Sequence, residues 1–294
     1  MSHSQNNLHA RAIALYDQFT HVHHDRRAFM RDLTALAGGV VAAEALLAAI
    51  APNAALAAQV AADESRLTAQ TISLPAAEGR VLNGYLVMPA KARRRGVVLV
   101  VHENRGLNDH IRDVARRLAL AGYIAFAADF LTSAGGTPGD EDAARTMIGK
   151  LDLAHAVADG AAAIRALKSY SGSNGRVGVV GFCWGGAMVN RLAVASGEDL
   201  AVGSAFYGPA PDPALAARVK ARLQLHYAGN DPRVNGTADA WVQGLQAAGV
   251  AVERFDYSGT EHAFHNDTAV ARYNPAAARL AWDRTLKLFA QTLR

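Results

Sequence analysis

The segment that most constrains the fold is a glycine-bounded turn around the only cysteine of the chain. Cys183 stands between Gly181 and Gly185, directly after the apolar, β-branched run 177–180. In a sharp strand-to-helix turn the central residue has a strained backbone, and its neighbours two positions away must be nearly side-chain free. The pattern is Gly-x-Ser-x-Gly with sulfur in place of oxygen, and it predicts a nucleophile at Cys183. The alternative is an ordinary buried cysteine, a common core residue.

A nucleophile of this kind needs an acid and a base, which follow it along the chain in loops after strands. The predicted strand 223–227 opens into a turn-rich loop, so Asp231 is the predicted orienting acid. The alternating strand 250–257 leads to His262, which is the predicted base. Each residue has a rival interpretation: Asp231 could cap the turn, and His265 is the nearest competitor of His262.

The spacing of His262 and His265 could also suggest a metal site. Neither a nearby cysteine nor a helical carboxylate pattern accompanies the pair, so we predict that the site holds no metal. We also expect no cofactor.

A further loop adds to the predicted site. The apolar run 95–101 is typical of a buried strand, and the loop after it begins His102-Glu103-Asn104-Arg105-Gly106. Negative charge on a reacting oxygen is held by two backbone N–H groups, one from the residue after the nucleophile and one from this earlier loop. We therefore predict the N–H groups of Trp184 and Asn104 as the two oxyanion donors.

Four segments together resemble the dienelactone hydrolase family over roughly residues 70–294. They are the loop 102–108, the turn 181–186, the loop around Asp231 and the segment 262–267. The resemblance implies an α/β-hydrolase-fold esterase, monomeric or loosely associated, that opens an enol-lactone ring. It implies a triad of Cys183, Asp231 and His262.

The resemblance also implies a role for Glu103, which matches a family glutamate that pairs with the resting thiol and shifts when substrate arrives. A carboxylate beside a thiol disfavours a second negative charge, so the sulfur stays protonated until the arrangement changes. The alternative is a loop carboxylate paired with Arg105 or Arg112, since such surface pairs are common.

One departure from the family concerns the substrate. Dienelactone-cleaving members have a carboxylate-binding arginine four residues after the catalytic histidine, where this chain has Asn266, and Arg145 cannot be aligned securely with a second family arginine. The segment 102–108 resembles a distinct branch of the family. The residues predicted to bind substrate are Arg105, Tyr207, Phe264 and Asn266.

The predicted reaction is hydrolysis of a small-molecule ester or lactone through a thioester on Cys183, with His262 and Glu103 helping to form the thiolate. Enzymes of other specificity, such as a thioesterase or a peptidase, are alternatives on the same fold. A non-catalytic thiol sensor or acyl-binding protein is a third, because a fold alone does not establish activity.

Composition agrees with one large α/β domain, since 294 residues with 51% hydrophobic content can form a sizeable core. Strands predicted near 81–87, 97–101, 123–128, 177–180, 200–206, 223–227 and 250–257 alternate with helices, including 110–121 and 276–293. This alternation predicts a mostly parallel sheet covered on both faces. The flexible loop 132–140 is expected to border the pocket.

Charge and cysteine content exclude other classes of function. The net charge of +4 is modest, so Arg93-Arg94-Arg95 is interpreted as a solvated turn and no nucleic-acid partner is expected. One cysteine excludes an internal disulfide. A homodimer is left open.

The N-terminal residues 1–64 are predicted to be a separate leader or extension before a catalytic domain of residues 65–294. Twin arginines at 26 and 27 precede an alanine-rich apolar stretch ending near residue 58, as in a twin-arginine export signal. Cleavage would give a periplasmic protein without an integral membrane segment. Because Glu44 interrupts the apolar stretch, the alternative is a retained helical extension on a cytoplasmic protein. His21, His23 and His24 are expected to be exposed residues of this extension rather than a metal site.

Overall fold

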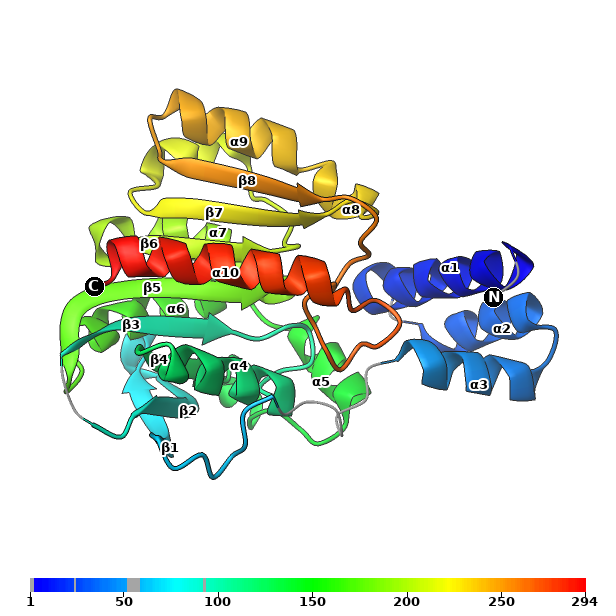
Figure 1. The fold of residues 1–294 in the computed structure, drawn as a ribbon, viewed down its shortest axis with the longest axis horizontal. Helices are drawn as coiled ribbons and strands as arrows, with labels where there is room; N and C mark the ends of the chain where they lie inside the picture. Colours follow the sequence, from blue (N-terminus) through cyan, green and yellow to red (C-terminus); the bar gives the residue numbers. More distant parts are fainter. Residues whose placement is uncertain (1–2, 24, 52–58, 92–93) are drawn as a thin grey trace.

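The computed structural model describes residues 3–23, 25–51, 59–91 and 94–294, and it contains one eight-stranded sheet with an N-terminal group of helices beside it (Figure 1). The strands are β1 (Leu67–Pro75), β2 (Val81–Pro89), β3 (Arg95–Val101), β4 (Ile124–Ala128), β5 (Ser173–Phe182), β6 (Val202–Phe206), β7 (Arg222–Ala228) and β8 (Val252–Tyr257). The helices after the first strand are α4 (Asp109–Leu120), α5 (Glu141–Ile148), α6 (Leu153–Lys168), α7 (Trp184–Ala195), α8 (Pro232–Asn235), α9 (Ala238–Ala247) and α10 (Pro275–Thr292).

The strand order is β1-β2-β4-β3-β5-β6-β7-β8. The pairs β1–β2 and β2–β4 are antiparallel, and every other neighbouring pair is parallel. The predicted mostly parallel sheet is therefore confirmed. The sequence analysis did not predict β1, because six of its nine residues face solvent and it lacks the apolar pattern of the central strands.

Helices cover both faces of the sheet, as the alternation of elements predicts. Figure 1 shows α4 and α10 in front of the sheet and α6 and α7 behind it. Each face has its own apolar core: Ile111 and Phe289 contribute to the first, and Ile164, Met188 and Trp241 to the second. Central strands such as β3 are buried on both sides, which explains their continuous apolar sequence.

All the parallel strands end at the same edge of the sheet, and Figure 1 shows the N-terminal helices against that edge. The loops after β3, β5, β7 and β8 carry Asn104, Cys183, Asp231 and His262 respectively. Side chains that follow parallel strands gather at such an edge, so the topology alone brings the predicted site residues near one another.

The N-terminal arm, which we define as residues 3–50, consists of α1 (His3–Gln18), the π-helical turn Phe19–His23, α2 (Arg26–Ala37) and α3 (Val40–Ile50). It has a small core of its own in which Phe19 stacks on Phe29 at 4.6 Å between ring centroids, with Leu33 and Ile50 fully buried. Asp25 caps α2 by accepting hydrogen bonds from two backbone N–H groups. The arm is thus a packed helical unit.

The arm is held on the sheet edge by buried arginines of the remainder of the chain. Arg272 pairs with Asp17 at 3.0 Å, and Arg105 donates a 2.8 Å hydrogen bond to the hydroxyl of Tyr16. The guanidinium of Arg145 lies 4.7 Å from the ring centroid of Phe19, within the range of a cation–π contact. These contacts pack the arm against the remainder of the chain.

The apolar stretch of the arm is broken in its middle. Helices α2 and α3 are bent by 107° at Gly38 and Gly39, and Gly38 has φ of 80°, a left-handed conformation that favours glycine. Within the described ranges, no single helix is long and apolar enough to cross a membrane, whereas the bent pair meets those limits of length and composition together. The predicted export-signal end at residues 53–58 and His24 lie outside the described residues.

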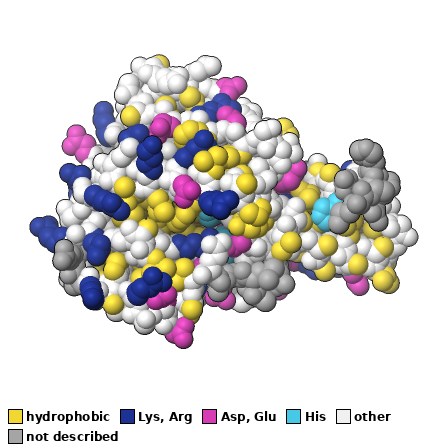
Figure 2. Space-filling view, in the orientation of Figure 1, with side chains coloured by type: hydrophobic (Ala, Val, Ile, Leu, Met, Phe, Trp, Pro, Cys, Tyr) yellow, Lys and Arg dark blue, Asp and Glu magenta, His cyan; other side chains and the backbone are white. Residues whose placement is uncertain are grey.

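The basic turn agrees with its prediction at Arg94, which is exposed, and differs from it at Arg95. Arg93 lies outside the described residues, whereas Arg95 begins β3 and donates to the carbonyl oxygen of Gly122 at 3.0 Å. Figure 2 shows the Lys and Arg side chains on this face scattered among acidic and apolar ones rather than gathered in a stripe.

Shortening Leu33 to alanine is expected to loosen the arm, because this fully buried side chain fills the centre of a small core. Losing a buried leucine costs about 2–5 kcal/mol. We expect amide hydrogen exchange in α1–α3 to accelerate accordingly. Val41→Ala is the matched control, since Val41 is 81% exposed in the same arm. Unchanged exchange in Leu33→Ala would show that the arm is not held by this core.

Candidate active site

The strand-to-helix turn predicted around Cys183 is present between β5 and α7. Cys183 has φ of 56° and ψ of −114°, a strained conformation, and its backbone N–H donates to the carbonyl oxygen of Phe206 at 3.0 Å. A Cβ atom on Gly181 would lie 2.2 Å from the carbonyl oxygen of Gly185, and one on Gly185 would lie 2.3 Å from that of Val101. The two glycines are therefore needed because backbone passes against backbone.

Two other non-glycine residues with positive φ lie beside this turn. They are Tyr207, with φ of 38°, and Ala263, with φ of 68°. Tyr207 follows β6 and its ring packs 5.0 Å from that of His262, while Ala263 is the residue after that histidine. Strained backbone that gathers at one place is a feature of functional sites.

Asp231 and His262 form a buried pair. The Nδ1 atom of His262 lies 2.5 Å from Oδ2 of Asp231, whose Oδ1 accepts the backbone N–H of Val234 at the start of α8. Asp231 therefore caps the first turn of α8 and also contacts the ring of His262, which is compatible with either interpretation of this residue. Burial raises the pKa of Asp231, but the charge and hydrogen bond of His262 outweigh it and lower the pKa below its usual value.

The ring of His262 lies beside the sulfur of Cys183. Its Nε2 is buried and has no hydrogen-bond partner among the described residues. A ring nitrogen of His262 and the sulfur of Cys183 lie within 4.8 Å of each other. Burial opposes the charge on His262, yet attraction to Cys183 and Asp231 prevails and raises the pKa of His262 to about 10.

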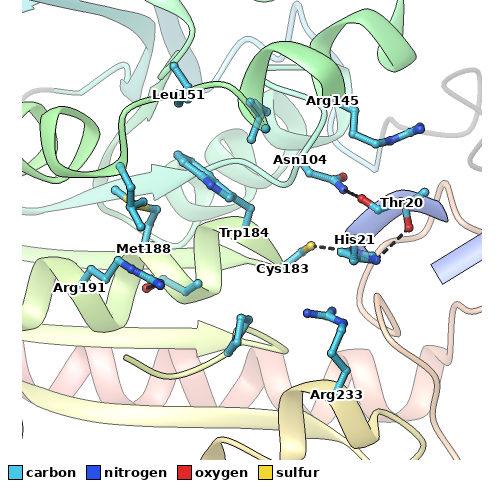
Figure 3. Close-up of a pocket in the computed structure, with 15 residues that line it drawn as sticks. Thr20, His21, Asn104, Arg145, Leu151, Cys183, Trp184, Met188, Arg191 and Arg233 are labelled. Atoms are coloured by element: carbon cyan, nitrogen blue, oxygen red, sulfur yellow. Dashed lines mark hydrogen bonds between the residues drawn. The ribbon is translucent and has the colours of Figure 1, made fainter. Parts of the chain in front are cut away.

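The hydrogen-bond partner of the thiol is His21 of the arm, which the sequence analysis expected to be exposed. Its Nε2 lies 3.1 Å from the sulfur of Cys183, and Figure 3 shows the ring reaching the cysteine from the arm. Its Nδ1 lies 2.9 Å from the carbonyl oxygen of Asp17 and 2.8 Å from the hydroxyl of Thr20. Burial, with the nearby charges of His262 and Arg233, lowers the pKa of His21 well below its usual value.

The expectation for His21 was wrong because the packing of the arm decides its position. It stands in a π-helical turn whose local sequence carries no motif, and it lies 162 residues from the cysteine along the chain. The side chain of His23 is not described.

Glu103 is buried in the same site but bonds to other partners than predicted. Its Oε1 accepts the hydroxyl of Tyr207 at 3.3 Å, and its Oε2 accepts the side-chain amide of Asn266 at 2.7 Å. The resting thiol bonds to His21 instead. Arg105, the alternative partner, binds Tyr16 and Glu141, and Arg112 lies over the ring of Tyr85.

The two predicted oxyanion donors lie on separate elements, and contacts with neighbouring residues fix each of them. Trp184 is the first residue of α7, where backbone N–H groups lack intrahelical partners. Its indole stacks on His102, with ring centroids 5.3 Å apart, and His102 Nε2 accepts the backbone N–H of Phe130 at 3.2 Å. The side chain of Asn104 donates to the carbonyl oxygen of Thr20 at 3.0 Å, which fixes this loop to the arm.

A cavity of about 330 Å³ leads to the sulfur. Three arginines contribute to its wall, and Figure 3 shows Arg145, Arg191 and Arg233 on different sides of Cys183. The lining side chains from the helices include Arg145, Ile148, Leu151, Trp184, Ala187, Met188, Arg191 and Arg233. The lining of the cavity thus combines apolar side chains with three arginines.

The predicted substrate-binding residues lie elsewhere. Tyr207, Phe264 and Asn266 are buried behind the site and do not line this cavity, while Arg105 borders only a much smaller space beside the sulfur. The segment around α5 and α6 lines the cavity in place of the loop 132–140. A helical signal was available in the sequence, because Trp184, Ala187, Met188 and Arg191 fall on one face of the helix after the cysteine.

His265, the rival of His262, lies away from the thiol. Its ring stacks on Phe182 at 5.0 Å between centroids and packs near His110 and Trp282, within the core on the α10 side of the sheet. Burial, followed by the charge of Arg117, lowers the pKa of His265 well below its usual value. The geometry therefore separates the two histidines of the 262–265 pair.

A mostly parallel sheet between two layers of helices, with a cysteine at the strand-to-helix elbow after its central strand, defines an α/β-hydrolase-fold hydrolase. The chain belongs to the dienelactone hydrolase family, which it matches over residues 82–293. Membership of this family supports the assignment of the protein as a hydrolase that acts on esters or lactones.

Known relatives agree with this assignment. A Methylorubrum extorquens protein provisionally named carboxymethylenebutenolidase is 30% identical over 247 residues, covering 79% of this chain and 84% of the relative. An Escherichia coli sequence provisionally named a hydrolase fragment is 48% identical over 110 residues, or 37% of this chain and 94% of the fragment. The crystal structure of a provisionally assigned dienelactone hydrolase from Klebsiella pneumoniae superposes with a TM-score of 0.67 at 27% identity, covering 76% of this chain and 99% of that one.

Proposed function

We propose that the protein hydrolyses carboxylic esters or lactones through Cys183, His262 and Asp231, with a thioester intermediate. The observation that carries the proposal is the 2.5 Å pair of Asp231 and His262, whose free Nε2 lies buried beside the elbow cysteine. A nucleophile, a base and a group that orients the base are the three parts that covalent acyl transfer requires.

The first step is attack of the thiolate on the carbonyl carbon. His262 holds the proton of Cys183, Sγ forms a bond to carbon, and the carbonyl oxygen becomes negatively charged. The backbone N–H groups of Trp184 and Asn104 stabilise this oxygen, an interaction worth about 3 kcal/mol per donor. The tetrahedral intermediate collapses as His262 protonates the leaving alcohol, which stays attached to the acyl group when the substrate is a lactone.

The second step hydrolyses the thioester. His262, oriented by Asp231, accepts a proton from water as the water attacks the carbonyl carbon, and the thiol leaves with that proton. Glu103 borders the same small space as the sulfur. Its part as a second acid–base group remains a prediction, because a shift toward the thiol would require it to leave Tyr207 and Asn266.

The cavity supports a substrate with an apolar body and a negative group. Ile148, Leu151 and Met188 offer apolar contact, while Arg145, Arg191 and Arg233 supply positive charge. These arginines would supply the positive charge that the family arginine provides at the position of Asn266. We expect esters and lactones that bear a carboxylate to react faster than their neutral analogues.

The function is tested with a panel of lactones, aryl esters, acyl thioesters and peptides, each offered to the full-length protein. We expect turnover of esters or lactones and a covalent acyl adduct on Cys183, seen by mass spectrometry of protein quenched during turnover. Preference for thioesters or peptides would assign one of the alternative enzymes. An acyl adduct that forms without turnover would favour an acyl-binding protein.

A further inference from the structure

Three side chains with metal-binding atoms converge at the site. Ring nitrogens of His21 and His262 and the sulfur of Cys183 all lie within 4.8 Å of one another. This is the one such group among residues that the structure describes. The residues come from three separate elements, namely the arm, the elbow after β5 and the loop after β8, so only the docked arm completes the set.

Both imidazole rings are held as metal-bound histidines are held. Asp231 binds Nδ1 of His262 at 2.5 Å, and the carbonyl oxygen of Asp17 lies 2.9 Å from Nδ1 of His21. An oxygen acceptor on one ring nitrogen fixes the tautomer and leaves the other nitrogen's lone pair for a metal. The buried Nε2 of His262, which has no hydrogen-bond partner in the described part of the chain, is that free atom.

The space between the three residues suits one ion. A small cavity of about 10 Å³ is bordered by His21, Cys183 and His262, with Glu103 and Asn104 among its other neighbours. That volume corresponds to about one water-sized sphere. In tetrahedral zinc sites the sulfur lies about 2.3 Å and the nitrogens about 2.0 Å from the ion, so ligand atoms are roughly 3.5 Å apart. The 3.1 Å separation of His21 Nε2 and Cys183 Sγ is close to that value.

We propose that the docked arm completes a Cys-His-His site for a thiophilic divalent cation, with Zn²⁺ as the preferred ion. One thiolate and two imidazoles match zinc and do not match magnesium or calcium, which prefer oxygen ligands. The sequence analysis predicted no metal because the pair His262 and His265 had no further ligand pattern beside it and His21 was expected to be exposed.

A bound ion would block hydrolysis, a consequence that rests on the proposed function. The metal would occupy the lone pairs of Cys183 and His262, so the sulfur could not attack and the imidazole could not accept a proton. Opening of the arm would remove His21 and weaken the site. The arm and the ion together would then act as a reversible cap on the nucleophile.

The site is tested by adding Co²⁺, a spectroscopic substitute for Zn²⁺, to reduced, metal-free, full-length protein. We expect one ion per chain, with a thiolate-to-cobalt charge-transfer band and the visible bands of a tetrahedral ion. Calorimetry with Zn²⁺ gives the affinity. We expect His21→Ala to weaken binding by at least about 10-fold and Cys183→Ala to abolish the charge-transfer band. His155→Ala is the matched control, because His155 is an exposed histidine outside the site.

Activity provides a separate readout. Equimolar Zn²⁺ is expected to stop ester turnover by the wild type, EDTA to restore it, and His21→Ala to need about 10-fold more zinc. Absence of the sulfur-to-cobalt band, or equal affinity in wild type and His21→Ala, would overturn the metal site. Ester turnover in such a protein would leave the proposed function intact, whereas metal binding without turnover would remove the function and keep the site.

Discussion

Cys183→Ala is expected to lose nearly all ester hydrolysis. Removing the nucleophile of a hydrolytic triad lowers kcat by up to about 10⁶-fold. The activity that remains comes from the oxyanion donors and substrate binding. We therefore expect kcat/KM for p-nitrophenyl acetate to fall by at least about 10³-fold. The measurement is release of p-nitrophenol under conditions where the uncatalysed rate is subtracted.

The control for this variant is a measurement that its native fold is retained. Cys183 contributes one small side chain to a large core, so circular dichroism and the unfolding midpoint of Cys183→Ala are expected to stay close to those of the wild type. Met188→Leu is a matched variant from the same cavity, since it changes the wall and leaves the triad intact. Equal turnover by Cys183→Ala and the wild type would remove this cysteine as the nucleophile.

Gly181→Ala is expected to have the largest effect on stability. The new methyl group would lie 2.2 Å from the carbonyl oxygen of Gly185, a distance that real Cβ atoms essentially never show. The obstacle is backbone at the elbow, so no side-chain rotation can relieve it. We expect a loss of more than about 3 kcal/mol in the free energy of unfolding, or failure to fold.

Gly139→Ala is the control for this substitution. Gly139 is exposed, has no heavy atom within 4 Å of the position that a new methyl group would take, and needs no left-handed backbone. The unfolding free energy of Gly139→Ala, measured by urea denaturation, is expected to lie within about 0.5 kcal/mol of the wild type. A stable, active Gly181→Ala protein would show that the elbow tolerates a wider turn than the structure has.

The elbow illustrates how far local sequence reasoning extends. The requirement for Gly181 and Gly185 is steric and local, so their spacing around Cys183 indicated the turn directly. The same holds for Asp231 and His262, because residues that end parallel strands meet at one edge of a sheet. The pairing of these two residues followed from strand order and loop position.

The contacts of individual side chains could not be predicted from local sequence in the same way. Glu103 was expected to bond to the thiol or to an arginine, yet Tyr207 and Asn266 hold it. The predicted substrate contacts Phe264 and Asn266 lie behind the site, because short loops can turn a residue toward the core as easily as toward the cavity. Which way each side chain points depends on packing that no local pattern records.

The chain's pattern of apolar runs, glycines and loop residues was sufficient to indicate a parallel α/β sheet and the order of its acid–base residues, since these depend on short-range sterics and strand periodicity. The tertiary structure alone placed the arm on the sheet edge and His21 on the sulfur of Cys183. That contact joins residues 162 positions apart and depends on how buried arginines and aromatic rings fit together, a condition that emerges only when the whole chain has packed.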